Sequence, residues 1–128
     1  MSELETLHYT GIEMSADGGS RFVDDRIELG VRPVAVGVDP MAVGELGSGA
    51  VAFVRSGGFD AVPHPAPARQ WVVMVRGTIE VTTTDGETRR FAPGDMLLAA
   101  DVEGLGHSTV AVGEPPFEAL FIPAPENR

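Results

Sequence analysis

QWVVMVRGTIEVTTTDGETRRFAPGDMLLA, residues 70–99, has the clearest strand and turn signals of the chain. Its apolar and β-branched residues fall into three runs of strand length, which are Trp71–Val75, Thr78–Thr83 and Met96–Ala99. Asp85-Gly86 separates the second run from Thr88–Phe91, and an Asp-Gly pair supplies the positive φ angles that a tight hairpin needs. Pro93-Gly94-Asp95 has the composition of a second tight turn. The stretch therefore predicts consecutive short strands joined by turns.

Turn-forming residues also divide the rest of the chain into short segments. Its 16 glycines and 10 prolines are spread along the sequence and cut it into short apolar runs. The further strand candidates are Val34–Val38, Ala50–Val54, His107–Val112 and Phe117–Ile122, with weaker ones at Phe22–Val23 and Arg26–Val31. No window has the apolar spacing of a helix, and Met41–Leu46 could form one helical turn at most. Many closely spaced strands predict an all-β fold, either a sandwich or a barrel.

The chain of 128 residues has room for one domain with a single core. We expect residues 1–128 to form that domain, with the barrel core over residues 50–122. Residues 1–30 are more acidic and less patterned, and they predict an arm packed on the barrel or on a partner subunit. Both faces of Trp71–Val75 are apolar, so this strand is either covered on both sides or has one face in a subunit interface. A homodimer is therefore expected.

The composition excludes several kinds of function. There is no Cys, and all nine basic residues are Arg, which rules out disulfides, thiolate nucleophiles and Schiff-base chemistry on lysine. A net charge of −10 argues against nucleic acid and anionic membranes as partners. No apolar leader or membrane span is present, so a cytoplasmic protein is expected. Acid/base or metal chemistry has 19 acidic residues and three histidines, His8, His64 and His107, to draw on.

Two motifs resemble those of the cupin superfamily. Residues 58–77, GFDAVPHPAPARQWVVMVRG, are similar to its first motif, which is Gly, five residues, His, one residue, His, three or four residues, Glu, six residues and Gly. Residues 93–107, PGDMLLAADVEGLGH, resemble its second motif, in which Pro-Gly-Asp opens a strand and a glycine-rich turn precedes a further His. The resemblance covers roughly residues 50–122, and it implies a small β-barrel or double-sheet jelly roll.

The resemblance also implies a site, and this chain departs from it at two positions. Metal-binding cupins use the two histidines and the glutamate of the first motif and the histidine of the second. Here His64 and His107 are kept, but Ala66 replaces the second His and Gln70 replaces the Glu. Gln70 offers a neutral carbonyl oxygen in place of a carboxylate, so a metal would be held more weakly. The cofactor expected is a divalent transition metal (Fe, Mn, Ni or Zn), or none.

Two mechanisms follow for a small organic substrate inside the barrel. In the first, a metal on His64, Gln70 and His107 acts as a Lewis acid, as in isomerases, cyclases and oxygenases of similar fold. In the second, His64 or His107 moves a proton while Gln70 positions the substrate. The residues expected to line the substrate pocket are Phe53, Val72, Met74, Ile79, Asp101 and Phe121. The alternative function is a non-catalytic cupin that binds a small ligand or serves for dimerisation.

Other polar residues carry weaker hypotheses. Asp101 and Glu103 precede His107 in the loop, and either could orient His107 or act as an acid or base, although a solvated loop carboxylate is the commoner outcome. Asp95 is expected to satisfy the amides of its own turn. His8 lies in the acidic N-terminal region without a motif, so no site role is assigned to it.

Overall fold

The computed structural model describes residues 5–57, 60–114 and 116–125, and its elements are β-strands, which account for 57% of the residues, with no helix. The strands are β1 (Thr6–Met14), β2 (Ser20–Glu28), β3 (Gly30–Arg32), β4 (Met41–Val43), β5 (Ala52–Ser56), β6 (Asp60–His64), β7 (Gln70–Arg76), β8 (Thr78–Thr83), β9 (Thr88–Phe91), β10 (Met96–Ala99), β11 (His107–Val112) and β12 (Phe117–Pro123). The predicted all-β class is confirmed. None of the described elements is a helix long and apolar enough to cross a membrane.

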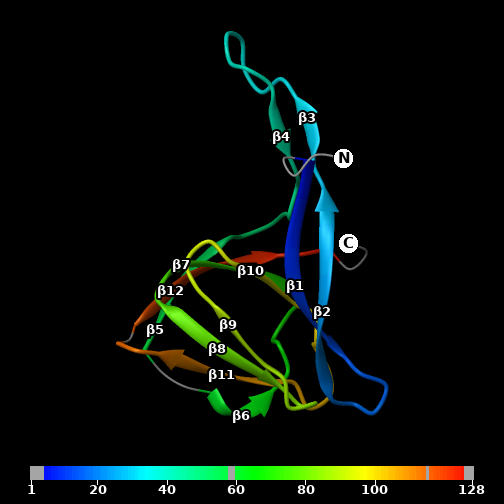
Figure 1. The fold of residues 1–128 in the computed structure, drawn as a ribbon, viewed down its shortest axis with the longest axis vertical. Coiled ribbons are helices and arrows are strands. Elements are labelled where there is room, and N and C mark those ends of the chain that lie inside the picture. Colours follow the sequence, from blue (N-terminus) through cyan, green and yellow to red (C-terminus); the bar gives the residue numbers. More distant parts are fainter. Residues whose placement is uncertain (1–4, 58–59, 115, 126–128) are drawn as a thin grey trace.

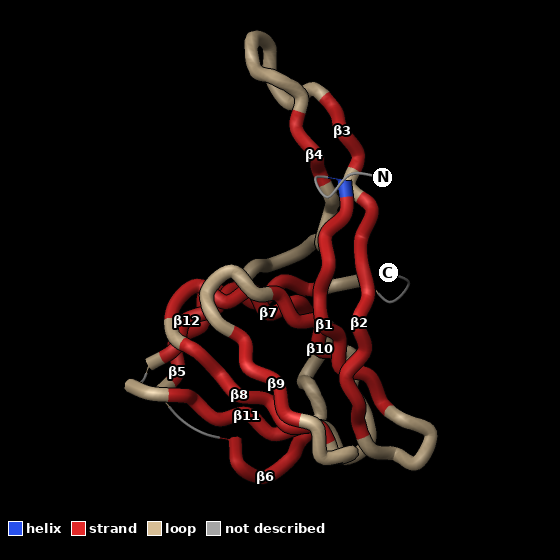
Figure 2. The backbone as a smooth tube through the Cα atoms, viewed as in Figure 1, coloured by secondary structure: helices blue, strands red, loops and turns tan. Residues whose placement is uncertain are grey.

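The strands form two large sheets and one small one (Figures 1 and 2). The six-stranded sheet has the order β2-β1-β10-β7-β12-β5, and the four-stranded sheet has the order β6-β11-β8-β9. Neighbouring strands are antiparallel except for β1 and β10, which run parallel. Neither sheet closes into a barrel over the described residues, so of the two predicted arrangements, a barrel and a double sheet, the structure has two facing sheets.

The main core fills the space between the two sheets. The six-stranded sheet contributes Ile12, Phe22, Val72, Met74, Leu97 and Ala119, and the four-stranded sheet contributes Ile79, Val81 and Phe91. Period-2 alternation in β8 directs Ile79 and Val81 inward while the residues between them face away from the core. Burying each large apolar side chain stabilises the fold by about 1.5–3 kcal/mol, so this shared core is what holds the sheets together.

β7 is a central strand that is covered on both faces. Its inward residues belong to the main core, and Trp71 on the outer face is completely buried in a second cluster with Ile27 and Leu98. The Trp71 Nε1–H group donates a 2.7 Å hydrogen bond to the carbonyl oxygen of Leu46, and the Tyr9 ring lies edge-on to the indole, with a centroid distance of 4.7 Å. Of the two predicted arrangements, coverage on both sides is the one observed, and the cover comes from the chain itself.

Most predicted strands are confirmed, and the predictions that differ from the structure do so for identifiable reasons. Val34–Val38 is not a strand but part of the loop between β3 and β4, where Pro33 and Pro40 flank the run and Gly37 has a φ of 80°. The expected helical turn over Met41–Leu46 was also wrong, because its first three residues form β4. The five-residue strand β6 was missed because it has few apolar residues and ends beside prolines.

The N-terminal region is a structural part of the six-stranded sheet. β1 and β2 pair over nine residues each, and β1 joins the sheet through its parallel pairing with β10. Ile12 and Phe22 from this ribbon belong to the main core. Residues 6–28 are therefore strands of the six-stranded sheet, and exposed charged residues such as Asp24 and Asp25 obscure the alternation of β2.

Candidate functional site

His107 lies at one end of the sandwich, where the two predicted histidines meet. It is the first residue of β11 and is paired with Thr83 of β8 on one side and with His64 of β6 on the other. Directly paired residues of antiparallel strands point to the same face. Because Val81 and Thr83 are buried on the inner side of β8, His107 also lies on the inward face of the four-stranded sheet.

His107 forms a buried contact with Asp101. The ring Nδ1 atom lies 2.6 Å from the Asp101 Oδ2 atom, and the exposed fractions of the two side chains are 11% and 0%. The second carboxylate oxygen, Oδ1, is buried and has no hydrogen-bond partner among the described residues. A buried carboxylate with an unsatisfied oxygen is energetically costly. The solvated loop carboxylate that the sequence favoured is therefore not what the structure contains.

The loop between β10 and β11 is held tightly against the rest of this end. The Ala66 amide donates a 3.0 Å hydrogen bond to the Asp101 carbonyl oxygen, and the Ser20 hydroxyl donates a buried 2.6 Å bond to the Gly106 carbonyl oxygen. Gly106 has a φ of 75°, and a Cβ atom there would collide with the backbone of His64. Glycine at this position thus lets the loop approach β6 closely enough to bring the two histidines together.

The two imidazoles are neighbours but differ in exposure. Their ring centroids are 5.9 Å apart, with an angle of 42° between the ring planes. His64 is exposed, and its Nδ1 atom lies 3.1 Å from the carbonyl oxygen of Pro65. The structure thus places a buried imidazole, that of His107, beside an exposed one, that of His64.

Gln70 lies on the opposing sheet. It is the first residue of β7, half-buried, and paired with Ala99 and Pro123. Alternation places it on the same inward face as Val72 and Met74. No hydrogen bond joins Gln70 to His107 in the described part of the chain. The structure thus brings the two histidines together and places Gln70 on the inward face of the other sheet, without a direct link to His107.

The residues expected to line a substrate pocket have different positions. Val72, Met74 and Ile79 are buried in the main core, and Phe121 packs against that core while half-buried. Phe53 is 55% exposed. Its strand partner Leu120 is paired in turn with Val73 of the outer cluster, so Phe53 lies on the outer face of the sheet, away from the inward residues. Only Asp101 of this set contacts a predicted site histidine.

Exposed apolar side chains occupy the segments around the two histidines. They are Met14 at the end of β1, Val62 on β6, and Val102 and Leu105 in the loop before β11. The Leu105 amide donates a 2.9 Å hydrogen bond to the Gly18 carbonyl oxygen, which ties this loop to the turn after β1. Glu103 in the same loop is exposed. The surroundings of the two histidines are therefore largely apolar.

A second polar region, which the sequence did not indicate, is a groove of about 850 Å³ between the β1–β2 ribbon and strand β9. Its lining residues are Leu7, His8, Tyr9, Thr10, Asp24, Asp25, Arg26, Arg89, Arg90, Phe91, Gly94, Asp95 and Met96. His8, to which no role was assigned, therefore borders a groove. Asp95 accepts a 2.8 Å hydrogen bond from the Ala92 amide, which confirms its predicted role in the turn.

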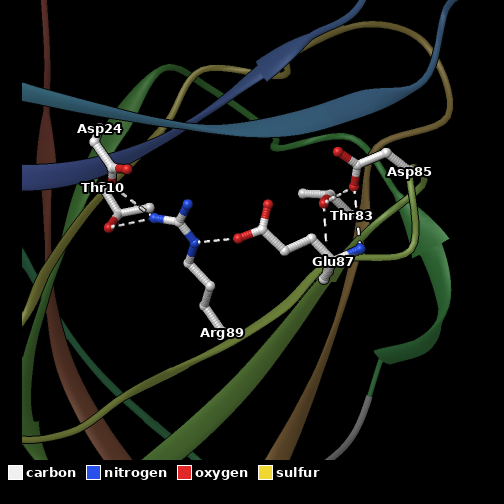
Figure 3. A network of polar contacts seen from close by, with 6 residues as sticks. All are labelled: Thr10, Asp24, Thr83, Asp85, Glu87 and Arg89. Atoms are coloured by element: carbon white, nitrogen blue, oxygen red, sulfur yellow. Dashed lines mark hydrogen bonds and ion pairs between the residues drawn. The ribbon is translucent and has the colours of Figure 1, made fainter.

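Arg89 is the most constrained cation of this groove. Its Nη1 atom lies 2.6 Å from Asp24 Oδ1 and its Nε atom 2.6 Å from Glu87 Oε2, and Figure 3 shows the guanidinium held between them. The hydrogen bond to Asp24, followed by that to Glu87, raises the pKa of the Arg89 guanidinium above its ordinary value. The guanidinium also lies 4.9 Å from the centre of the Phe22 ring. These contacts link β9 of the four-stranded sheet to the β1–β2 ribbon of the six-stranded sheet.

The described residues include no group of three or more His, Asp or Glu side chains placed to hold a metal ion. The donors that remain for a metal are the imidazoles of His64 and His107 and, on the opposing sheet, the amide oxygen of Gln70. Asp101 is already engaged with His107. The set is therefore poorer than the four-ligand site that the motif resemblance implies.

No family model matches this chain, and no curated protein is significantly similar to it.

Proposed function

We propose that this chain is a cupin-type jelly-roll enzyme that transfers a proton on a small organic substrate, with His107 as the general acid or base. The observation that carries the proposal is the buried Asp101 carboxylate 2.6 Å from His107 Nδ1. A fully buried carboxylate is expensive to keep in an apolar interior. Its cost is readily explained when the carboxylate sets the chemistry of a neighbouring imidazole.

Asp101 is the positioning residue in this proposal. A carboxylate oxygen only accepts, so the 2.6 Å contact requires a proton on His107 Nδ1. In the neutral imidazole the lone pair is then on Nε2, the nitrogen available to take a proton from a substrate. The carboxylate also stabilises the imidazolium that forms after the transfer. Asp101 and His107 thus act as one unit, as in other carboxylate–histidine pairs used for acid/base catalysis.

His64 and the apolar surroundings supply binding. The His64 ring lies beside His107 on the solvent side and is placed to contact a polar atom of the substrate. Met14, Val102 and Leu105 offer apolar contacts to the remainder of the molecule. The substrate class that fits is a small, mostly apolar compound with one acidic proton, such as a ketone, an enone or a phenol. Isomerisation and cyclisation are the reactions that one proton-transfer site can perform on such compounds.

The metal-assisted mechanism is the second candidate, because a carboxylate behind a histidine is also the usual outer support of a metal ligand. The residues fit a metal only incompletely. Two imidazoles are close together, and the third donor, Gln70, is neutral and lies on the opposing sheet. A metal there would act as a Lewis acid, but the proposed proton transfer does not require one. Elemental analysis for Fe, Mn, Ni and Zn on untagged protein separates the two mechanisms.

The proposal is tested by solvent deuterium exchange. A panel of small ketones, enones and phenols is incubated with the protein in D₂O, and deuterium incorporation is measured by mass spectrometry. Compounds that exchange with the wild type should exchange about 10²–10⁴-fold more slowly with His107→Gln, because the proton acceptor is lost. The matched control is His8→Gln, which changes a histidine in the Arg89 groove and should leave the rate unchanged.

Three outcomes are distinguishable. Exchange that is lost with His107→Gln and kept with His8→Gln supports the enzyme. Exchange that survives His107→Gln contradicts the assignment of His107. Binding of a panel compound without exchange, seen as a stabilised melting transition, supports the alternative of a non-catalytic ligand-binding cupin.

The positioning role of Asp101 is tested by a separate measurement, the tautomer of the His107 imidazole. Asp101→Asn retains the shape of the side chain but can present an NH₂ group to Nδ1, which favours the other tautomer of His107. The ¹⁵N chemical shifts of His107 should therefore move to the tautomer protonated on Nε2, with a loss of exchange activity. An unchanged tautomer would show that Asp101 has a structural role in the loop and does not set the protonation of the imidazole.

A further inference from the structure

The hairpin Gly30–Val43, called the arm below, projects from the sandwich and is exposed throughout residues 30–41 (Figure 1). β3 and β4 pair over three residues each, and the loop between them spans residues 33–40. A two-stranded hairpin of this size is at best marginally stable on its own in water. Its ordering costs conformational entropy that no burial within this chain offsets. Such an arm needs a surface to pack on.

The arm is also unusually apolar for an exposed segment. Its exposed large apolar side chains are Val31, Val34, Val36, Val38 and Met41, with exposed fractions from 44% to 104%. Scattered exposed apolar residues are normal, but a cluster on one projecting element marks an interaction site. Burying these five side chains against another surface would remove their apolar area from water, which would stabilise the contact. We therefore expect another protein surface to cover the arm.

The charge of the arm indicates what covers it. The whole chain has a net charge of −10, whereas the arm has one cation, Arg32, and one anion, Asp39, so its own charge is zero. Neither residue has an ion-pair partner within the described ranges of the chain. A second acidic copy can thus approach the arm with less repulsion than it would meet elsewhere. In a two-fold arrangement, Arg32 of each arm can pair with Asp39 of the other.

We infer that the arm is a dimerisation element that packs against the arm of a second copy of this chain, with reciprocal Arg32–Asp39 pairs across the two-fold axis. The arm lies at the opposite end of the molecule from β6, which carries His64 (Figure 1). Dimerisation through the arm therefore leaves the end of the molecule that carries His64 uncovered. A like copy fits this surface because one cation and one anion on the same element are self-complementary across a two-fold axis.

The test is the solution mass of the full chain and its variants, measured by light scattering after size exclusion at micromolar concentration. The wild type should have twice the monomer mass of 13.5 kDa. Val36→Asp places a charge at the centre of the proposed interface and should weaken the dimer at least tenfold. Val62→Asp, which places the same charge on an exposed valine of β6, is the matched control and should leave the dimer intact.

Charge reversal tests the reciprocal pairs directly. Arg32→Asp should weaken the dimer because each interface then contains only anions, and Arg32→Asp with Asp39→Arg should restore it. Val36 is fully exposed, so its substitution should not alter the melting temperature of the monomer, which serves as the check on folding. A monomeric wild type, a dimer that survives Val36→Asp, or a double reversal that does not restore assembly would each overturn the inference.

Discussion

Two polar contacts of the same length lie in different environments of this molecule. His107 Nδ1 and Asp101 Oδ2 are 2.6 Å apart, as are Arg89 Nη1 and Asp24 Oδ1. The Asp101 side chain is completely buried, whereas that of Asp24 is 77% exposed. Distance alone therefore does not distinguish the two contacts, and burial does.

The two contacts also differ in how many of their polar atoms have hydrogen-bond partners. Arg89 has acceptors in Asp24, Glu87 and the Thr10 hydroxyl, so its donors are well used in holding β9 to the β1–β2 ribbon (Figure 3). The Asp101 carboxylate has one oxygen on His107 and one without a partner among the described residues. The Asp101 contact therefore includes a buried oxygen without a partner, which the Arg89 contacts do not, and such costly groups are where function is expected.

The largest effect on stability is expected from breaking the buried pair. Asp101→Ala leaves the His107 ring without its partner and opens a cavity beside it, so the free energy of unfolding should fall by about 3 kcal/mol. Chemical denaturation at neutral pH measures this change. A loss below about 1 kcal/mol would show that the burial of Asp101 contributes little to the fold.

A smaller effect is expected from the exposed pair, although it has the same length. Asp24→Ala should lower the free energy of unfolding by less than about 1 kcal/mol, because solvent already screens the carboxylate and Glu87 still pairs with Arg89. The difference from the wild type should shrink further in high salt, whereas that of Asp101→Ala should not. Equal losses for the two variants would contradict the distinction between the contacts.

The smallest effect concerns the turn that adjoins the Arg89 network. The hydrogen bond from the Thr83 hydroxyl, and then that from the Glu87 amide, lower the pKa of Asp85 below its ordinary value. A pKa that is lower in the folded than in the unfolded state stabilises the fold above the unfolded pKa, and this contribution is lost as the pH falls through the folded pKa. Asp85→Asn should therefore be slightly less stable than the wild type at pH 7. The difference should begin to shrink as the pH falls below the ordinary Asp pKa of about 3.9, and it should vanish only below the lower pKa of the folded state.

Thermal melts of the wild type and Asp85→Asn from pH 7 to pH 3 provide the measurement. A difference that stays constant over this range would show that the carboxylate charge does not contribute through the turn.

The sheet strands were predictable where local chemistry is unambiguous. Thr78–Thr83 and Thr88–Phe91 are strands with the predicted ends, because alternation and the Asp-Gly turn require nothing from the rest of the molecule. Val34–Val38 is equally apolar but forms no strand. A run of valines becomes a strand only where a neighbouring strand is available to pair with it.

The proximity of the two histidines could be predicted from the sequence, and the burial of Asp101 could not. Their positions in two cupin-like motifs indicated His64 and His107, and strand pairing places them side by side. Asp101 could not be separated from Glu103 by sequence, since both precede His107 in one loop and only one of them is buried. The Arg89 network left no local signal, because Asp24 is 65 residues away along the chain.

The sequence by itself determined the all-β class, the tight turns and the identity of the few residues capable of acid/base chemistry, because these depend on local backbone preferences and on composition. The tertiary structure decided that the two sheets do not close into a barrel, that Arg89 links β9 to the β1–β2 ribbon, and that Asp101 is buried against His107. Burial and long-range pairing decide these properties, since they depend on which distant segments pack together and therefore on how far water is excluded from each charge.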